Sequence, residues 1–213
     1  MADITLHHVP QSRSDRVLWL LRELGVAVDV RIWPFDKSLR GRDFLALNPA
    51  GRVPALELDG QAIWESGAMI ELLCERFGQL GRPPGDPERA AWLIWVHFAE
   101  TLSQHAAACT QQHVALREDW MRSPTVMKIE AARIGKCFDA IEARLSGDWL
   151  LTGFSAADVA VAQAVDMGRR FHRIGARPRM AAWLDRCQAR PAWAASQGGV
   201  GVYTQEFYEV PDA

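Results

Sequence analysis

The fold is decided by residues 48–68, NPAGRVPALELDGQAIWESGA, where a proline-containing turn, two short apolar strands and a helix start follow one another. Segments 55–58 and 62–64 have strand character, and the Asp59-Gly60 dipeptide between them is typical of a tight hairpin turn. Ser66 is a good N-cap for a following helix, whose apolar residues recur at helical spacing. The stretch therefore predicts a β-hairpin that leads directly into a helix.

The residues before this stretch predict a β-α-β unit. Segment 4–8 is a short apolar strand, segment 16–24 is a helix that Gly25 ends, and segment 26–32 alternates as a second strand does. A helical crossover joins the first two strands, so we expect them to pair in parallel, whereas the hairpin adds an antiparallel pair. The result is an α/β domain with a mixed four-stranded sheet and helices on its faces.

The residues after this stretch predict a second, all-helical domain. Segment 78–87 holds three glycines and three prolines, which is the composition of a linker. We expect a first domain at 1–78, a linker at 79–87 and an all-α helical bundle at 88–213. No strand is expected beyond the linker, and the predicted helices are 88–120, 125–145, 156–170 and 180–189.

Composition narrows the class of protein. The chain has 213 residues, 49% of them hydrophobic, and a formal net charge of −2, so it lacks the basic excess of proteins that bind nucleic acids or anionic membranes. No apolar run is long enough to cross a bilayer, and no secretory signal is evident, so we expect a cytoplasmic protein. The four cysteines form neither a CxxC pair nor a zinc-type cluster, and we expect them to be reduced.

Two positions in the opening stretch could bind a peptide-like ligand. A cis bond between Val53 and Pro54 would free the backbone of Val53 to pair with an extended peptide, although an ordinary trans proline in a loop is the simpler interpretation. The start of the helix at Ser66 could hold a carboxylate, although a plain N-cap explains this serine equally well.

The loop at 10–16 could stabilise a thiolate. Ser12 and Ser14 precede a helix, where a hydroxyl donor and the helix dipole together lower the pKa of a thiol. In the alternative interpretation, Ser14 caps the helix and Ser12 is a loop residue.

In their order and spacing these segments resemble the cytosolic glutathione transferase superfamily over nearly the whole chain. The segment at 153–165 resembles the buried capping box of that superfamily, in which Ser155 and Asp158 bond to each other's backbone. The motifs that carry the resemblance are RVLWLLRELG (16–25), NPAGRVPALELDG (48–60), WESGAMIELLCERFG (64–78), GFSAADVAVAQAV (153–165) and AAWLDRCQARPAW (181–193).

The resemblance implies a thioredoxin-like first domain that binds glutathione as co-substrate, without a metal. Ser12 matches the catalytic hydroxyl of the serine-type classes, four residues before Arg16, and Ser14 is the competing candidate. Arg52 matches a basic position that in some classes meets the glycine carboxylate of glutathione, a role that Arg40 could share.

The resemblance also implies how the rest of glutathione is held. Val53 matches the residue whose backbone pairs with the cysteinyl unit, and Pro54 matches the cis-proline of the family. Glu65 and Ser66 match the pair that grips the γ-glutamyl end. The first loop contains neither Cys nor Tyr, which argues against the thiol-exchanging and tyrosine-type classes.

Three further residues form a tentative site for the electrophile. His105, Cys109 and His113 are spaced by four, which places them on one face of a helix. No fourth ligand for a metal is evident, so we expect the stripe to face the cleft between the domains, where the family binds its electrophile.

The resemblance therefore implies a glutathione transferase that conjugates the glutathione thiolate to a hydrophobic electrophile in detoxification, acting as a homodimer. One alternative is a glutathione-dependent peroxidase, dehalogenase or isomerase on the same fold. The other is a non-catalytic glutathione-binding module, because a fold does not dictate its function.

Overall fold

The computed structural model describes residues 3–210 and divides into two compact units. The first unit contains residues up to Arg89 together with Ala189–Val202, and the second contains Ala90–Gln188 together with residues from Tyr203 onward. The sequence predicts that all of 88–213 belongs to the helical domain, and the structure differs for one segment. Residues 189–202 join the first unit because their partners lie there, which helical periodicity cannot reveal.

The first unit is built on a mixed four-stranded sheet, as the sequence predicts. Strand β1 pairs in parallel with β2 and antiparallel with β3, and β3 pairs antiparallel with β4, which gives the order β2-β1-β3-β4. The four strands are β1 (Ile4–His8), β2 (Asp29–Ile32), β3 (Ala55–Leu58) and β4 (Gln61–Trp64).

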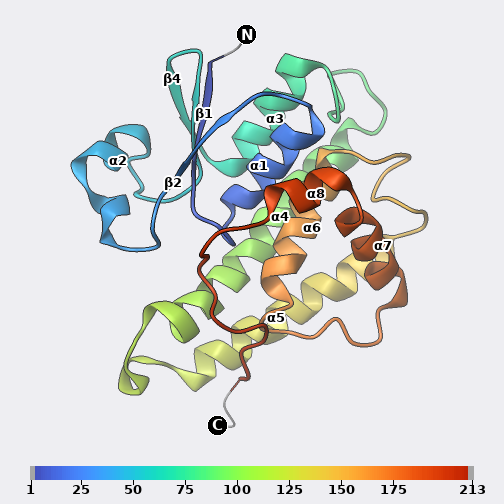
Figure 1. Cartoon of the computed structure of the whole chain (residues 1–213). Helices are drawn as coiled ribbons and strands as arrows, with labels where there is room; N and C mark the ends of the chain where they lie inside the picture. Colours follow the sequence, from blue (N-terminus) through green and yellow to red (C-terminus); the bar gives the residue numbers. More distant parts are fainter. Residues whose placement is uncertain (1–2, 211–213) are drawn as a thin grey trace. The chain divides into compact units, whose positions relative to one another are not determined.

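Helices cover both faces of this sheet. Figure 1 shows α1 and α3 together on one face and α2 on the other. Gly78, in the left-handed conformation at φ 63°, is the C-cap of α3. The helices of the sheet are α1 (Ser14–Glu23), a 3-10 turn η1 (Lys37–Arg40), α2 (Arg42–Leu47) and α3 (Ser66–Phe77).

A fourth helix of this unit comes from the far end of the chain. Helix α8 (Pro191–Ser196) packs on α1, and the two lie side by side in Figure 1. The rings of Trp19 and Trp193 meet edge to face, with their centroids 4.8 Å apart. Arg190 donates two hydrogen bonds of 2.7 Å to the carboxylate of Glu23. These contacts explain why the segment leaves the helical unit.

The second unit contains helices and no strand in its described residues, as the sequence predicts. Figure 1 shows its two long helices, α4 and α5. The long helix expected at 88–120 ends earlier, because α4 gives way to a π-helical turn and then a short 3-10 turn. The elements are α4 (Arg89–Thr110), η2 (Gln111–Ala115), η3 (Asp119–Met121), α5 (Pro124–Arg144), α6 (Ala156–Gly168) and α7 (Pro178–Gln188).

The predicted capping box begins α6. The carboxylate of Asp158 accepts the backbone N–H of Ser155 at 2.9 Å, and Ser155 caps the first turn in return. Asp158 also accepts the N–H of Leu150 and the indole N–H of Trp183, each at 2.9 Å, so this buried carboxylate joins α6 to α7. Within residues 3–210, none of the helices combines the length and apolar character that a membrane crossing requires.

Candidate functional site

Three of the predicted site segments meet at one edge of the sheet. His7 lies opposite Ala55 in the pairing of β1 with β3, and Ala55 lies opposite Trp64 in the pairing of β3 with β4. Because β3 runs antiparallel to both neighbours, the end of β1, the start of β3 and the end of β4 share this edge. The loop with Ser12 follows β1. The Val53–Pro54 turn precedes β3, and the start of α3 follows β4.

The loop after β1 is held by hydrogen bonds to Ser14. Its Oγ accepts the N–H of Val9 at 3.1 Å and lies 3.0 Å from the Val9 carbonyl oxygen and 2.8 Å from Nδ1 of His8. Ser14 is fully buried, whereas Ser12 is partly exposed. The Oγ of Ser12 lies 2.7 Å from that of Ser14 and accepts the Ser14 N–H at 3.1 Å.

This geometry corrects the interpretation of Ser14 as a helix cap. The N-cap of α1 is Arg13, and no side chain bonds to the amides of the first turn from that position. The hydroxyl of Ser14 turns back to β1 instead, since its partners Val9 and His8 precede the helix. Of the two serines, Ser12 is therefore the one that a ligand can reach.

His8 contacts the loop of the candidate site, and the sequence analysis did not identify it. Burial lowers the pKa of His8 to about 4, so its imidazole is neutral near pH 7. Its Nδ1 faces Ser14 and its Nε2 lies 3.7 Å from a carboxylate oxygen of Asp15, which itself accepts the N–H of Gln11 at 3.2 Å. A histidine at the end of a strand carries no local signal for this role, because the pairing with Ser14 depends on how the loop turns.

The Val53–Pro54 peptide bond is cis, which is the less common of the two forms weighed from the sequence. The turn before it is organised by Asn48, another residue that sequence reasoning missed. The buried amide of Asn48 donates to the carbonyl oxygen of Arg52 at 2.5 Å and accepts the N–H of Ala50 at 3.0 Å. An Asn before Pro is a turn signal, and it could have identified this residue.

The two basic candidates, Arg52 and Arg40, are both exposed and belong to the same loop region. Between them, Gly51 adopts φ 62°, and a side chain there would come within 2.9 Å of the Leu39 carbonyl oxygen. Only glycine permits this close approach. The turn therefore brings the segment that carries Arg40 next to the segment that carries Arg52.

The start of α3 differs slightly from the prediction. Glu65, rather than Ser66, is the N-cap, and it adopts φ 75°, which is unusual for a residue with a side chain. Ser66 is the buried first residue of the helix, and Glu65 is exposed. The amides of a first helical turn favour a negatively charged group, so this corner can hold a carboxylate.

The stripe on α4 does not form one open cluster. Cys109 is fully buried, and burial raises the pKa of its thiol to about 12. His105 pairs with Glu130 at 2.7 Å, and the ring of His113 stacks on Phe171 at 5.5 Å. His113 belongs to the π-helical turn, which breaks the α-helical spacing that predicted a common face. In the described part of the chain, no group of three His, Cys, Asp or Glu residues could hold a metal ion.

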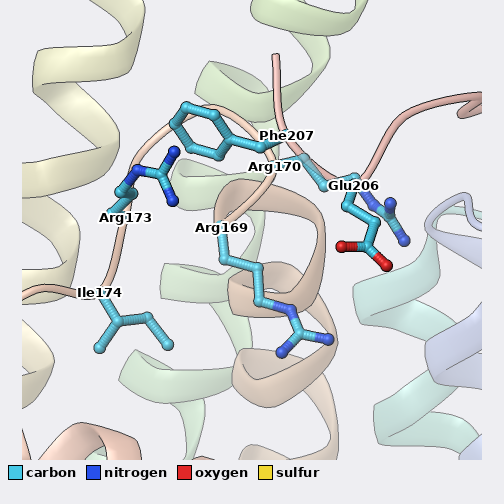
Figure 2. Close-up of a pocket in the computed structure, with 6 residues that line it drawn as sticks. All are labelled: Arg169, Arg170, Arg173, Ile174, Glu206 and Phe207. Carbon is cyan, nitrogen blue, oxygen red and sulfur yellow. The ribbon is translucent and has the colours of Figure 1, made fainter. Parts of the chain in front are cut away.

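Two cavities lie elsewhere, and neither is lined by the predicted site residues. One, of about 590 Å³, lies beside β4 and α3. The other, of about 640 Å³, lies in the helical unit, and Figure 2 shows the arginines that line it, Arg169, Arg170 and Arg173. The positive charge there is largely balanced: Arg169 pairs with Asp166 at 2.6 Å, and Arg173 pairs with Glu209 at 3.2 Å.

Comparison with known proteins connects this geometry to one family. Residues 6–83 match the model "Glutathione S-transferase, N-terminal domain" and residues 105–191 match "Glutathione S-transferase, C-terminal domain". Glutathione S-transferase 3 of Zea mays is 29% identical over 207 residues, which cover 91% of this chain and 92% of that protein.

Solved structures give the same result. A glutathione transferase from Methylococcus capsulatus is 28% identical, with a TM-score of 0.79 and coverage of 91% of this chain and 96% of that one. The glutathione transferase URE2P8 from Phanerochaete chrysosporium, solved with oxidized glutathione, has a TM-score of 0.82 at 22% identity and covers 92% and 94% of the two chains. The second likeness supports the fold alone.

Proposed function

The chain belongs to the glutathione S-transferase family, and from this premise we propose that it conjugates the thiolate of glutathione to an electrophilic small molecule. One observation carries the proposal. The register of the sheet gathers the Ser12 loop, the cis Val53–Pro54 turn and the start of α3 at a single edge. That edge combines a hydroxyl donor, an exposed backbone turn and a helix N-terminus, which suit the thiol, peptide and carboxylate groups of glutathione.

Ser12 is the proposed donor to the thiolate. Its partial exposure supports it over the buried Ser14. A hydrogen bond to the charged sulfur stabilises the thiolate and not the thiol, so it lowers the pKa of the bound thiol. Such a bond contributes about 1.5–3 kcal/mol, and 1.36 kcal/mol corresponds to one pKa unit. The protein supplies no covalent nucleophile in this scheme, and it contributes thiolate stabilisation and proximity.

The remaining contacts with glutathione follow the same edge. We assign the backbone of Val53, beside cis Pro54, to the cysteinyl unit, and Glu65 with Ser66 to the γ-glutamyl end. Arg52 is assigned to the glycine carboxylate. These assignments are supported by the pairing of Ala55 with Trp64, which places the Val53–Pro54 turn beside the start of α3.

The electrophile is proposed to meet the helical unit. His105 and His113 remain candidates there, since both are partly exposed, whereas the fully buried Cys109 offers no surface to a ligand. Glutathione-dependent peroxide reduction, dehalogenation and isomerisation use the same thiolate and stay as alternatives.

The test combines binding and turnover. Calorimetry should detect glutathione binding, and Ser66→Ala should weaken it by removing a contact worth about 1.5–3 kcal/mol. Turnover with aromatic halides or epoxides, but not with peroxides, supports conjugation. Binding without any turnover would identify a non-catalytic glutathione-binding module, and an unchanged dissociation constant in Ser66→Ala would remove that residue from the site.

A homodimer in the cytoplasm, acting in detoxification, completes the proposal. Large apolar side chains are exposed on the segment predicted as the long helix 88–120, including Ile94 at 66% and Trp120 at 81%. Such surface favours association. Sedimentation at micromolar concentration should show a species of twice the chain mass of 23.8 kDa. A single species with the mass of one chain would reject the dimer.

A further inference from the structure

The hydroxyl of Ser12 is the outer end of a chain of hydrogen-bonding groups. Its Oγ lies 2.7 Å from Oγ of Ser14, which lies 2.8 Å from Nδ1 of His8. Ser14 and His8 are both buried, with exposed fractions of 0% and 3%. Water therefore has little access to the inner groups, and their proton positions are set by one another.

Proton counting restricts how Ser14 can bond. A serine hydroxyl has one proton to donate and can accept two hydrogen bonds. The N–H of Val9 can only donate, so it occupies one acceptor position of Ser14. The single proton of Ser14 can go to the Val9 carbonyl at 3.0 Å, to His8 at 2.8 Å or to Ser12 at 2.7 Å.

The direction of the short Ser12–Ser14 bond decides where the Ser12 proton points. If Ser12 donates, its proton faces inward and is unavailable to sulfur. If Ser14 donates, Ser12 Oγ accepts both that proton and the Ser14 N–H at 3.1 Å, and its own proton is directed away from Ser14. The second direction leaves the Val9 carbonyl oxygen without the Ser14 proton, and it is favoured when the two acceptor positions of Ser14 are filled by the Val9 N–H and by a proton on Nδ1 of His8.

We propose that Ser14 and His8 are positioning residues that direct the Ser12 proton at the glutathione sulfur. His8 donates from Nδ1 to Ser14, Ser14 donates to Ser12, and Ser12 donates to the thiolate. The hydroxyls only rotate, so no proton is transferred and no covalent bond changes. The neutral His8 can carry its proton on Nδ1, because Asp15 at 3.7 Å is too distant to hold it on Nε2 by a hydrogen bond.

This inference rests on the proposed function, in which Ser12 is the thiolate donor, and a double-mutant cycle separates the two. The measurement is the pH titration of the thiolate absorbance of bound glutathione. We expect Ser12→Ala to raise the pKa of the bound thiol by roughly one to two units and Ser14→Ala to raise it by about one unit. The double variant should match Ser12→Ala alone, because no hydroxyl then remains to be positioned.

Each other pattern has a distinct meaning. If Ser12→Ala shifts the titration and Ser14→Ala does not, the proposed function stands and this inference is wrong. If the two shifts add in the double variant, Ser14 acts independently of Ser12, and the inference is again wrong. If Ser12→Ala leaves the titration unchanged, the assignment of Ser12 fails, and the positioning role fails with it.

Variants at His8 test the inner end of the chain and replace Ser14→Ala if that protein does not fold. His8→Asn can still donate near the position of Nδ1 and should titrate within a few tenths of a unit of wild type, whereas His8→Leu should resemble Ser14→Ala. Equal shifts in both would exclude the donor role of His8. Ser196→Ala is the matched control, since it removes another buried hydroxyl of the same unit, bonded to the Trp193 carbonyl at 2.7 Å, and should not shift the titration.

Discussion

Burial of a neutral imidazole at His8 makes the stability of the fold depend on pH. The pKa is about 4 in the folded chain and about 6.5 in the unfolded chain, so between these values the unfolded state binds more protons. The free energy of unfolding should therefore fall as the pH drops from 6.5 to 4, by an amount on the order of 3 kcal/mol. Burial lowers the pKa of His113 and His172 as well, so these two groups also lower the free energy of unfolding as the pH drops.

Urea unfolding at several pH values between 4 and 7.5 measures this dependence, with His8→Asn as the comparison. The variant should keep the contribution of His113 and His172 and lose that of His8, so its stability should change less with pH. Equal pH dependence in both proteins would show that His8 is not buried as a neutral group.

Asp158 should matter for folding and not for chemistry. Asp158→Ala removes the capping box, which costs about 0.5–2 kcal/mol, and leaves the indole N–H of Trp183 without its partner, which costs about 1–3 kcal/mol more. Thermal unfolding should show a large drop in Tm. Asp148→Ala is the control, because its exposed pair with Arg186 contributes at most about 1 kcal/mol. A variant that keeps its Tm but loses activity would move Asp158 into the site.

At the scale of elements, α8 is held to α1 by one polar anchor and one aromatic contact. The carboxylate of Glu23 accepts two hydrogen bonds from Arg190 and one from the indole of Trp19 at 2.9 Å. The carboxylate is nearly buried, with 7% of its side chain exposed, so water cannot readily replace a lost partner.

Arg190→Ala should therefore lower the free energy of unfolding by on the order of 2 kcal/mol. The matched control is Arg31→Ala in the same unit, whose pair with Asp29 is exposed on both sides and should change stability by less than about 1 kcal/mol. Denaturant unfolding of the two variants beside wild type measures both values. Equal effects would mean that the α1–α8 contact is held by the tryptophans alone.

At the scale of the whole molecule, the chain passes between the two units three times, near residues 89, 188 and 202. The first unit is therefore not a single segment of sequence. A fragment of residues 1–89 lacks α8, so it exposes the α1 surface around Trp19 that the full chain buries.

We expect that fragment to unfold at a lower urea concentration than the same fragment joined to residues 189–202 by a Gly/Ser linker. Circular dichroism during urea unfolding measures the two midpoints. A fusion that carries both Arg190→Ala and Trp193→Ala has the same length but lacks the contacts with Glu23 and Trp19. Its urea midpoint should therefore lie close to that of the fragment 1–89 alone. The interpretation of α8 as part of the first unit fails if all three midpoints coincide.

Much of the fold and part of the candidate site were predictable from local patterns. Alternation at 55–58, the Asp59-Gly60 turn and the apolar spacing of α3 predicted the hairpin and helix. The cis Val53–Pro54 bond was implied by the family resemblance, whereas the dipeptide alone favoured the trans form. The Ser155–Asp158 capping box was predictable for the same reason, since its partners are three residues apart. Backbone turns, caps and periodic faces depend on neighbours in the chain, and a sequence contains that information directly.

The amino-acid sequence by itself thus determined the two architectures, the parallel pairing of the first two strands, the antiparallel hairpin and the segments of the candidate site, but not the pairing of β1 with β3 that completes the sheet. The tertiary structure alone decided that residues 189–202 join the first unit, that Ser14 turns inward to His8 instead of capping α1, and that a π-helical turn separates His113 from Cys109. Each of these outcomes depends on which buried groups meet after the chain has folded. A buried polar group takes whichever partner satisfies it at the lowest cost, and that partner, such as Arg190 for Glu23, can lie far away in the sequence.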